Sequence, residues 1–140
     1  MSQSRKESIQ PIRPIRVVIL GSTGSIGVQA LEIIARNPDR FMVVGLCATG
    51  ANAQALAQAA LEFDVEVIGV TLGTCAQDVQ MHLLAGAQER GFSQGEHRLP
   101  ELVIGPDAPE RLARMDADIV LNAIAGAAGL KATLATLSEG

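Results

Sequence analysis

The sequence predicts an α/β domain built on a doubly wound parallel sheet. Short apolar runs rich in Val, Ile and Leu alternate with longer Ala-rich segments of helical period. Hydrophobic residues make up 48% of the 140 residues and aromatic residues only 2%, so the core must consist of aliphatic side chains. This composition is typical of parallel strands covered by Ala-rich helices. The amino-terminal residues 1–14 are polar and aperiodic, so we expect a flexible leader there and one domain at residues 15–140.

Strands are expected wherever a short apolar run is bounded by turn residues. The first run is β-branched and ends at Gly21. In chain order, the predicted strands are residues 15–20, 41–48, 65–70, 102–104 and 118–124. Right-handed crossovers between parallel strands give a Rossmann-like sheet, for which we expect the strand order 3-2-1-4-5.

Helices are expected between the strands, where apolar residues recur at helical spacing. Ser25, Asn52 and Thr74 are the expected N-caps of the first three helices, because their side-chain oxygens can accept hydrogen bonds from helix amides. Pro38 ends the first helix. The predicted helices are residues 25–37, 52–63, 74–89, 109–115 and 129–138, with a surface loop at 91–100.

Charge and composition exclude several kinds of partner. A net charge of −4 and the lack of Trp and Tyr argue against nucleic acid, which needs basic surfaces and stacking platforms. No apolar run is long enough to span a bilayer and no signal peptide is recognisable, so we expect a cytoplasmic protein that does not bind membranes. The cysteines and histidines lack metal-ligand spacing, so we predict two free thiols, no metal site and no identifiable catalytic residue; these residues are Cys47, Cys75, His82 and His97.

A glycine-rich segment lies between the first predicted strand and the first predicted helix. Gly21 permits a tight turn, Gly24 lets a diphosphate approach the backbone, and Gly27 lets the helix pack closely. Free amides from Thr23 to Ile26 would then face the anion at the positive end of the helix. The alternative is that the glycines serve only the turn and the helix crossing. The candidate cofactor residues here are Gly21, Ser22, Thr23, Gly24, Ser25, Ile26 and Gly27.

Two further turns complete the candidate site. No acidic residue follows the second strand to bind a ribose 2'-hydroxyl, which favours NADPH over NADH. The turn there can present amides and polar side chains to a 2'-phosphate, although Asn52 can equally be an ordinary helix cap; its residues are Thr49, Gly50, Ala51 and Asn52. After the fifth strand, small residues either floor the nicotinamide pocket or merely ease a turn; the candidates are Ala123, Ile124 and Gly126.

On these motifs, the chain resembles the amino-terminal domain of 1-deoxy-D-xylulose 5-phosphate reductoisomerases of actinobacterial type. Residues 19–46 (ILGSTGSIGVQALEIIARNPDRFMVVGL) and 117–140 (ADIVLNAIAGAAGLKATLATLSEG) carry the similarity. The resemblance implies an NADPH-dependent enzyme, homodimeric when full length, that uses Mg or Mn. It would isomerise and reduce a phosphorylated ketose to 2-C-methyl-D-erythritol 4-phosphate, in non-mevalonate isoprenoid biosynthesis. The implied cofactor residues are Thr23, Gly24, Ser25, Ile26, Gly50, Ala51 and Asn52.

The resemblance also marks two departures. Ala51 stands where the family often has a basic residue, and the segments that hold the metal and the substrate are expected beyond Gly140. We therefore expect this chain to bind cofactor without catalysis. Alternatives are an extended short-chain or a semialdehyde dehydrogenase type, or a non-catalytic nucleotide sensor; the chain lacks the Tyr that the first of these needs.

Overall fold

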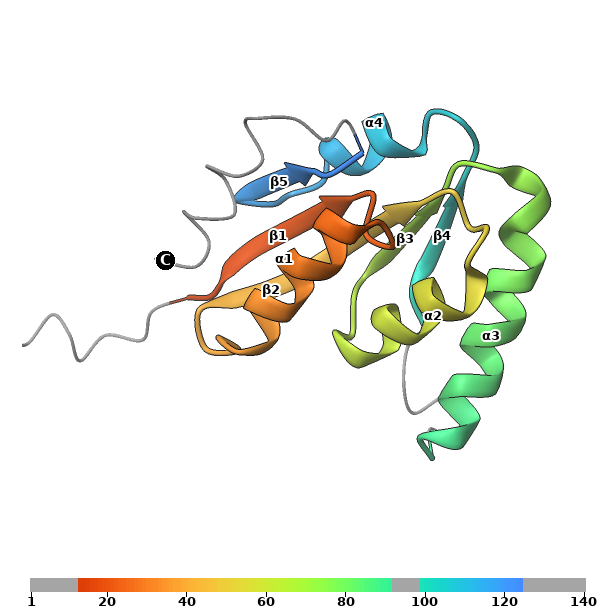
Figure 1. Cartoon of the computed structure of the whole chain (residues 1–140), viewed down its shortest axis with the longest axis horizontal. Coiled ribbons are helices and arrows are strands. Elements are labelled where there is room, and N and C mark those ends of the chain that lie inside the picture. Colours follow the sequence, from red (N-terminus) through yellow and green to blue (C-terminus); the bar gives the residue numbers. More distant parts are fainter. Residues whose placement is uncertain (1–12, 92–98, 125–140) are drawn as a thin grey trace, which may run out of the picture.

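The computed structural model describes residues 13–91 and 99–124, which form a parallel sheet with helices on both faces (Figure 1). The strands are β1 (Ile15–Leu20), β2 (Phe41–Ala48), β3 (Val67–Val70), β4 (Glu101–Ile104) and β5 (Ile119–Asn122). The helices are α1 (Ser25–Ala35), α2 (Ala53–Glu62), α3 (Ala76–Glu89) and α4 (Ala108–Ala113), with a 3-10 turn at Gly73–Cys75. The predicted α/β class is confirmed.

The strand order is β4-β3-β2-β1-β5, so the predicted order 3-2-1-4-5 is wrong. The chain continues outward after β3, and β4 pairs with β3 in parallel from Val67↔Glu101 to Val70↔Ile104. Only then does α4 carry it back to β5, which pairs with the other side of β1. Strand β4 is short and largely exposed, which suits an edge. As a result β5, not β4, is the neighbour of β1.

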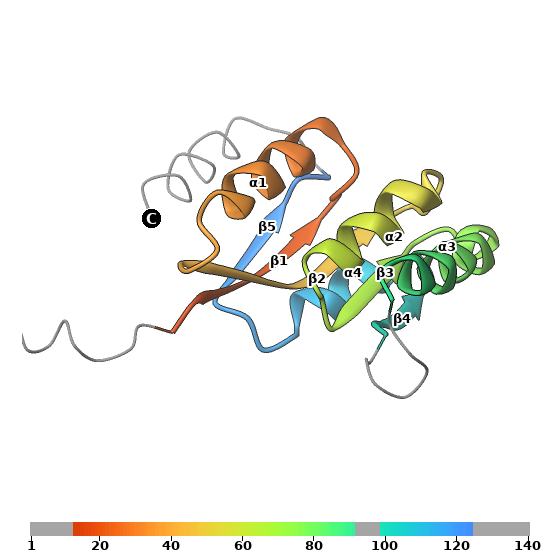
Figure 2. The same cartoon turned by 90° about the horizontal axis from the view of Figure 1, so that it is seen from below.

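Two hydrophobic layers enclose the sheet, because successive residues of β1 point to opposite faces. Val17 and Ile19 pack under α1, α2 and α3, whereas Val18 and Leu20 pack towards α4. Figure 2 shows α4 on the face of the sheet opposite α1 and α2. Within the described residues, no helix is both long and apolar enough to cross a membrane.

The helix caps differ in part from those predicted. Asn52 caps α2 as expected, and its Oδ1 accepts a hydrogen bond from the amide of Ala55 at 3.2 Å. Ser25 is instead the first residue of α1, whose N-cap is Gly24 without a side-chain hydrogen bond. Thr74 lies in the 3-10 turn, which delays α3 until Ala76. The predicted leader to residue 12, most of the predicted loop at 91–100 and the predicted helix at 129–138 lie outside the described residues.

Candidate functional site

The glycine loop, residues 21–27, joins β1 to α1 and is held against β2 by its backbone. The amides of Gly21 and Ser22 both donate to the carbonyl oxygen of Cys47, at 2.7 and 3.0 Å. Gly21 has a φ of +87°, which favours glycine. A Cβ on Gly27 would lie 2.3 Å from the carbonyl oxygen of Gly21, so α1 rests directly on the loop. Gly21 and Gly27 thus have the turn and packing roles predicted for them.

Gly24 is different, because nothing in the described protein requires a glycine there. Its φ of −78° and ψ of 171° are open to any residue. The nearest atom to a Cβ at this position would be the Gly21 carbonyl oxygen at 3.6 Å, an ordinary contact. The backbone of Gly24 is exposed. A group outside the fold can therefore approach this peptide closely.

Open amides surround Gly24 at the start of α1. The amide of Gly24 itself donates to the carbonyl oxygen of Gly21 at 3.2 Å, so the expectation that this amide is free is wrong. The first helical bond runs from the Val28 amide to the Gly24 carbonyl oxygen. Within the described part of the chain, the amides of Thr23, Ser25 and Ile26 have no acceptor. Three donors without acceptors at the positive end of a helix are an arrangement that can hold an anion.

Ser22 contributes a buried hydroxyl to the same loop. The residue is 2% exposed, and its Oγ is the one buried side-chain polar atom in the described residues without a hydrogen-bond partner. No sequence pattern distinguishes this hydroxyl from those of Thr23 and Ser25. Its isolation depends on the packing of the loop, which only the structure shows.

Some polar groups of the β2–α2 turn form hydrogen bonds with the turn's own backbone and with the start of α2. Thr49 Oγ1 accepts a hydrogen bond from the amide of Ala51 at 3.1 Å, and Asn52 Oδ1 caps α2. Gly50 has a φ of +94°, and a Cβ there would lie 2.7 Å from Val70 Cγ1. The Thr49 hydroxyl proton and the Asn52 side-chain amide remain as donors, and both residues are exposed.

A cavity of about 350 Å³ connects the glycine loop with the β2–α2 turn. Ser22, Thr23 and Asn52 line it where the two turns meet, and side chains of α1 and α2 form its walls. The turns lie side by side because β1 and β2 are paired neighbours. The two predicted halves of the cofactor site are thus brought together.

The end of β5 joins the same edge of the sheet. The Ala123 amide donates to the Leu20 carbonyl oxygen at 2.7 Å, and the Ile124 amide to Asn122 Oδ1 at 3.0 Å. A Cβ on Gly21 would lie 2.9 Å from the Ile124 backbone nitrogen. The observed strand order creates this contact, since β5 lies beside β1. Gly126, the third candidate in this segment, lies outside the described residues.

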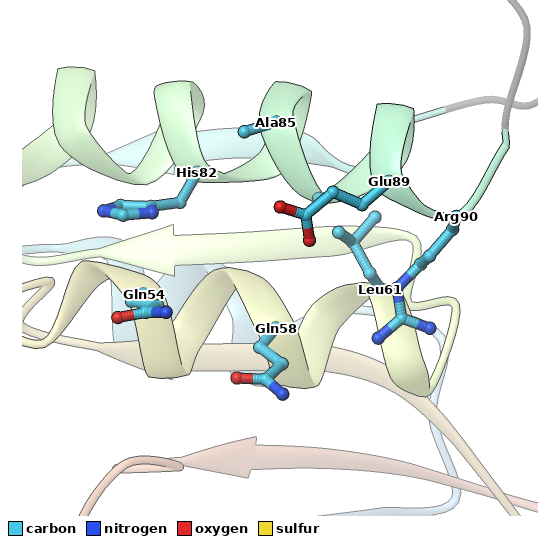
Figure 3. A pocket seen from close by; sticks show the side chains of 8 residues that line it. Gln54, Gln58, Leu61, His82, Ala85, Glu89 and Arg90 are labelled. Carbon is cyan, nitrogen blue, oxygen red and sulfur yellow. The ribbon is translucent and has the colours of Figure 1, made fainter.

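Of the remaining chemical candidates, His82 lies in a different groove. His82 lines a groove of about 190 Å³ between α2 and α3, together with Gln54, Gln58 and Arg90 (Figure 3). Burial raises the pKa of the Cys47 thiol to about 11, so this cysteine is not a nucleophile at neutral pH. No group of three His, Cys, Asp or Glu side chains that could hold a metal occurs in residues 13–91 and 99–124.

A doubly wound parallel sheet with a glycine loop at the start of its first helix defines a Rossmann-like α/β domain. The family model of 1-deoxy-D-xylulose 5-phosphate reductoisomerase matches residues 17–140, and the chain belongs to this family. That membership sets aside the two dehydrogenase types considered above.

Relatives and solved structures agree with this assignment. The chain is 46% identical over 125 residues to the 1-deoxy-D-xylulose 5-phosphate reductoisomerase of Cutibacterium acnes, covering 89% of this chain and 30% of that protein. It is also 46% identical over 126 residues to that of Mycolicibacterium smegmatis, covering 89% and 27%. The Zymomonas mobilis enzyme in complex with NADPH matches with a TM-score of 0.63 at 32% identity, covering 78% of this chain and 25% of that one. The chain thus spans less than a third of the length of these relatives.

Proposed function

We propose that residues 15–140 form the NADPH-binding domain of a 1-deoxy-D-xylulose 5-phosphate reductoisomerase, preceded by a leader at 1–14. The observation that carries this proposal is the set of open amides at Thr23, Ser25 and Ile26 beside Gly24. A solved relative that is similar to most of this chain is a complex with NADPH, which supports the choice of ligand.

In the proposed binding mode, the NADPH diphosphate lies over Gly24 at the start of α1. Each amide or helix-end interaction with the anion contributes about 0.5 to 1 kcal/mol. The nicotinamide half extends towards the end of β5, at Ala123, Ile124 and Gly126. A 2'-phosphate would lie at the β2–α2 turn, formed by Thr49, Gly50, Ala51 and Asn52.

Neutral groups would recognise that 2'-phosphate. Ala51 offers no cation, and neither α1 nor α2 contains a Lys or Arg. The donors left are the Thr49 hydroxyl and the Asn52 side-chain amide, since their oxygens already accept hydrogen bonds within the turn. Preference for NADPH over NADH then depends on these donors and on the absence of a carboxylate after β2.

We further propose that the whole protein isomerises and reduces 1-deoxy-D-xylulose 5-phosphate in the cytoplasm, as a homodimer that uses NADPH and Mg or Mn. One solved relative is a complex with NADPH, fosmidomycin and magnesium, at a TM-score of 0.60 and 25% identity, covering 79% of this chain and 24% of that one. The nicotinamide would supply the hydride. The described residues would bind and orient the nicotinamide. They include no cluster of side chains that could hold a metal.

The direct test is a calorimetric titration of the chain with NADPH and with NADH. We expect tighter binding of NADPH, because the β2–α2 turn has donors and no carboxylate for the ribose. Equal affinity would remove the proposed role of that turn. Failure of both nucleotides to bind would remove the cofactor site itself.

A further inference from the structure

We infer that Ser22 couples the stability of the free domain to occupancy of the anion site. Its hydroxyl has no partner among the described protein groups and gains one when a diphosphate group lies at the start of α1. This inference rests on the proposed function, because it concerns the same site. It gives Ser22, already a candidate cofactor residue, a second effect, which is to lower the stability of the free fold.

The hydroxyl of Ser22 is isolated by packing. The residue is 2% exposed, so bulk solvent does not reach this hydroxyl, and no described protein group accepts a hydrogen bond from it or donates one to it. The backbone around it cannot shift easily, because its amide donates to the Cys47 carbonyl oxygen at 3.0 Å. On its other side α1 lies close, since a Cβ on Gly27 would be 2.7 Å from the Ser22 Cα. With the backbone held, the hydroxyl can change its direction only by rotation about the side-chain bonds of Ser22.

Folding alone gives no reason for a serine at this position. A buried hydroxyl without a hydrogen bond destabilises a protein, whereas alanine at the same site would bury no polar group. Ser22 nevertheless lines the cavity that Thr23 and Asn52 also line. The open amides of Thr23 and Ser25 lie close by in the chain. Rotation of the hydroxyl towards this cavity would let it donate to an anion held by those amides.

The oxygen atoms of a diphosphate are the partner that fits best. A hydroxyl that donates to a charged oxygen forms a shorter and stronger bond than one between neutral groups. The helix end and the amides attract the same negative charge. Binding would therefore give the Ser22 hydroxyl a hydrogen bond to the same anion whose charge the amides and the helix end stabilise.

The experiment compares the wild-type chain with Ser22→Ala. Melting is followed by far-UV circular dichroism, and binding of NADPH and of inorganic pyrophosphate by calorimetry. We expect the melting temperature of the ligand-free variant to rise by roughly 2 to 4 °C. We expect its dissociation constants for both ligands to increase about tenfold.

Ser25→Ala is the matched control, because Ser25 lies in the same loop but is exposed. Water satisfies its hydroxyl in the free protein, so its removal should not raise the melting temperature. A rise that is confined to Ser22→Ala would show that the isolated hydroxyl, and not the loss of any serine from this loop, is the cause.

Two results would overturn the inference. An unchanged or lower melting temperature of Ser22→Ala would mean that the hydroxyl is already satisfied, for example by an internal water. Unchanged affinity for both ligands would mean that it does not contact the anion. If the wild type bound pyrophosphate but not NADPH, the proposed function would fail, and the pyrophosphate measurements would still test Ser22. If it bound neither ligand, the proposed function and the inference on Ser22 would both be overturned.

Discussion

The three glycines of the loop between β1 and α1 are evenly spaced, yet the structure separates their roles. Gly21 is needed for its positive φ, and Gly27 for the close approach of α1. Gly24 has neither constraint, and its backbone faces solvent beside the open amides. At the scale of single residues, Gly24 is therefore the position where folding and binding can be tested separately.

Alanine at Gly24 and at Gly27 should have opposite effects on stability. Gly27→Ala forces a Cβ to within 2.3 Å of a backbone oxygen and should lower the free energy of unfolding; we expect a loss of about 3 kcal/mol. Gly24→Ala meets only an ordinary contact and should raise the free energy by about 0.5 kcal/mol. Denaturant titration by circular dichroism measures both, since the chain has no Trp or Tyr.

Binding supplies the second half of this comparison. Gly24→Ala should weaken NADPH binding several-fold, because the methyl group of the alanine would occupy space that the diphosphate needs. A Gly24→Ala variant that is both as stable and as tightly binding as the wild type would contradict the role assigned to this glycine.

The spacing of these glycines, between a strand and a helix, was enough to predict the turn at Gly21 and the close packing at Gly27. It could not reveal that the Cys47 carbonyl oxygen anchors the loop, because every residue carries such an oxygen. Nor could it distinguish the hydroxyl of Ser22 from its neighbours, since burial depends on how α1 rests on the loop.

At the scale of secondary-structure elements, α1 and α2 begin in different ways. A side-chain oxygen of Asn52 caps α2, whereas α1 begins after Gly24 with no side-chain cap. Uncapped amides cost stability unless a ligand or water satisfies them. The helix that is left open is the one expected to hold the diphosphate.

Two substitutions at Asn52 separate capping from phosphate binding. Asn52→Ala removes the oxygen that accepts from the Ala55 amide and should lower the free energy of unfolding by about 1 kcal/mol. Asn52→Asp keeps a capping oxygen, so stability should be retained. It replaces the side-chain amide with a carboxylate, so NADPH should bind more weakly relative to NADH.

Denaturant titration and calorimetry on the two variants decide the matter. An aspartate variant that keeps the wild-type preference for NADPH would show that Asn52 serves α2 alone. Hydrophobic periodicity was sufficient to predict both helices, but the N-cap of α1 was predicted one residue late because Ser25 is a common capping residue.

At the scale of the whole molecule, the order of the strands is what the sequence could not supply. Apolar runs predict that strands exist, and right-handed crossovers limit their connections. Neither tells whether the chain after β3 continues outward or turns back. The short and largely exposed β4 is compatible with an edge only once its pairing with β3 is known.

The stability of the whole molecule should fall at alkaline pH because of Cys47. Burial raises the pKa of this thiol from 9.0 to about 11, so between these values the unfolded chain has lost a proton that the folded chain retains. Stability is therefore present in full below pH 9.0 and decreases towards pH 11, by at most about 3 kcal/mol. The chain has no Tyr, which simplifies its titration in this range.

Denaturant titrations across this pH range, in the presence of a reductant, measure the decrease. Cys47→Ala should reduce the slope, although it also lowers stability at neutral pH by leaving a small cavity. An equal slope in the variant and the wild type would assign the alkaline loss to other groups.

The contact between Gly21 and Ile124 joins the turn after β1 to the peptide that follows β5. With only 2.9 Å between a Cβ at Gly21 and the Ile124 nitrogen, the two backbones touch without an intervening side chain. Any side chain at position 21 would therefore press on the peptide that leaves β5, so the turn after β1 and the end of β5 tolerate only a glycine between them.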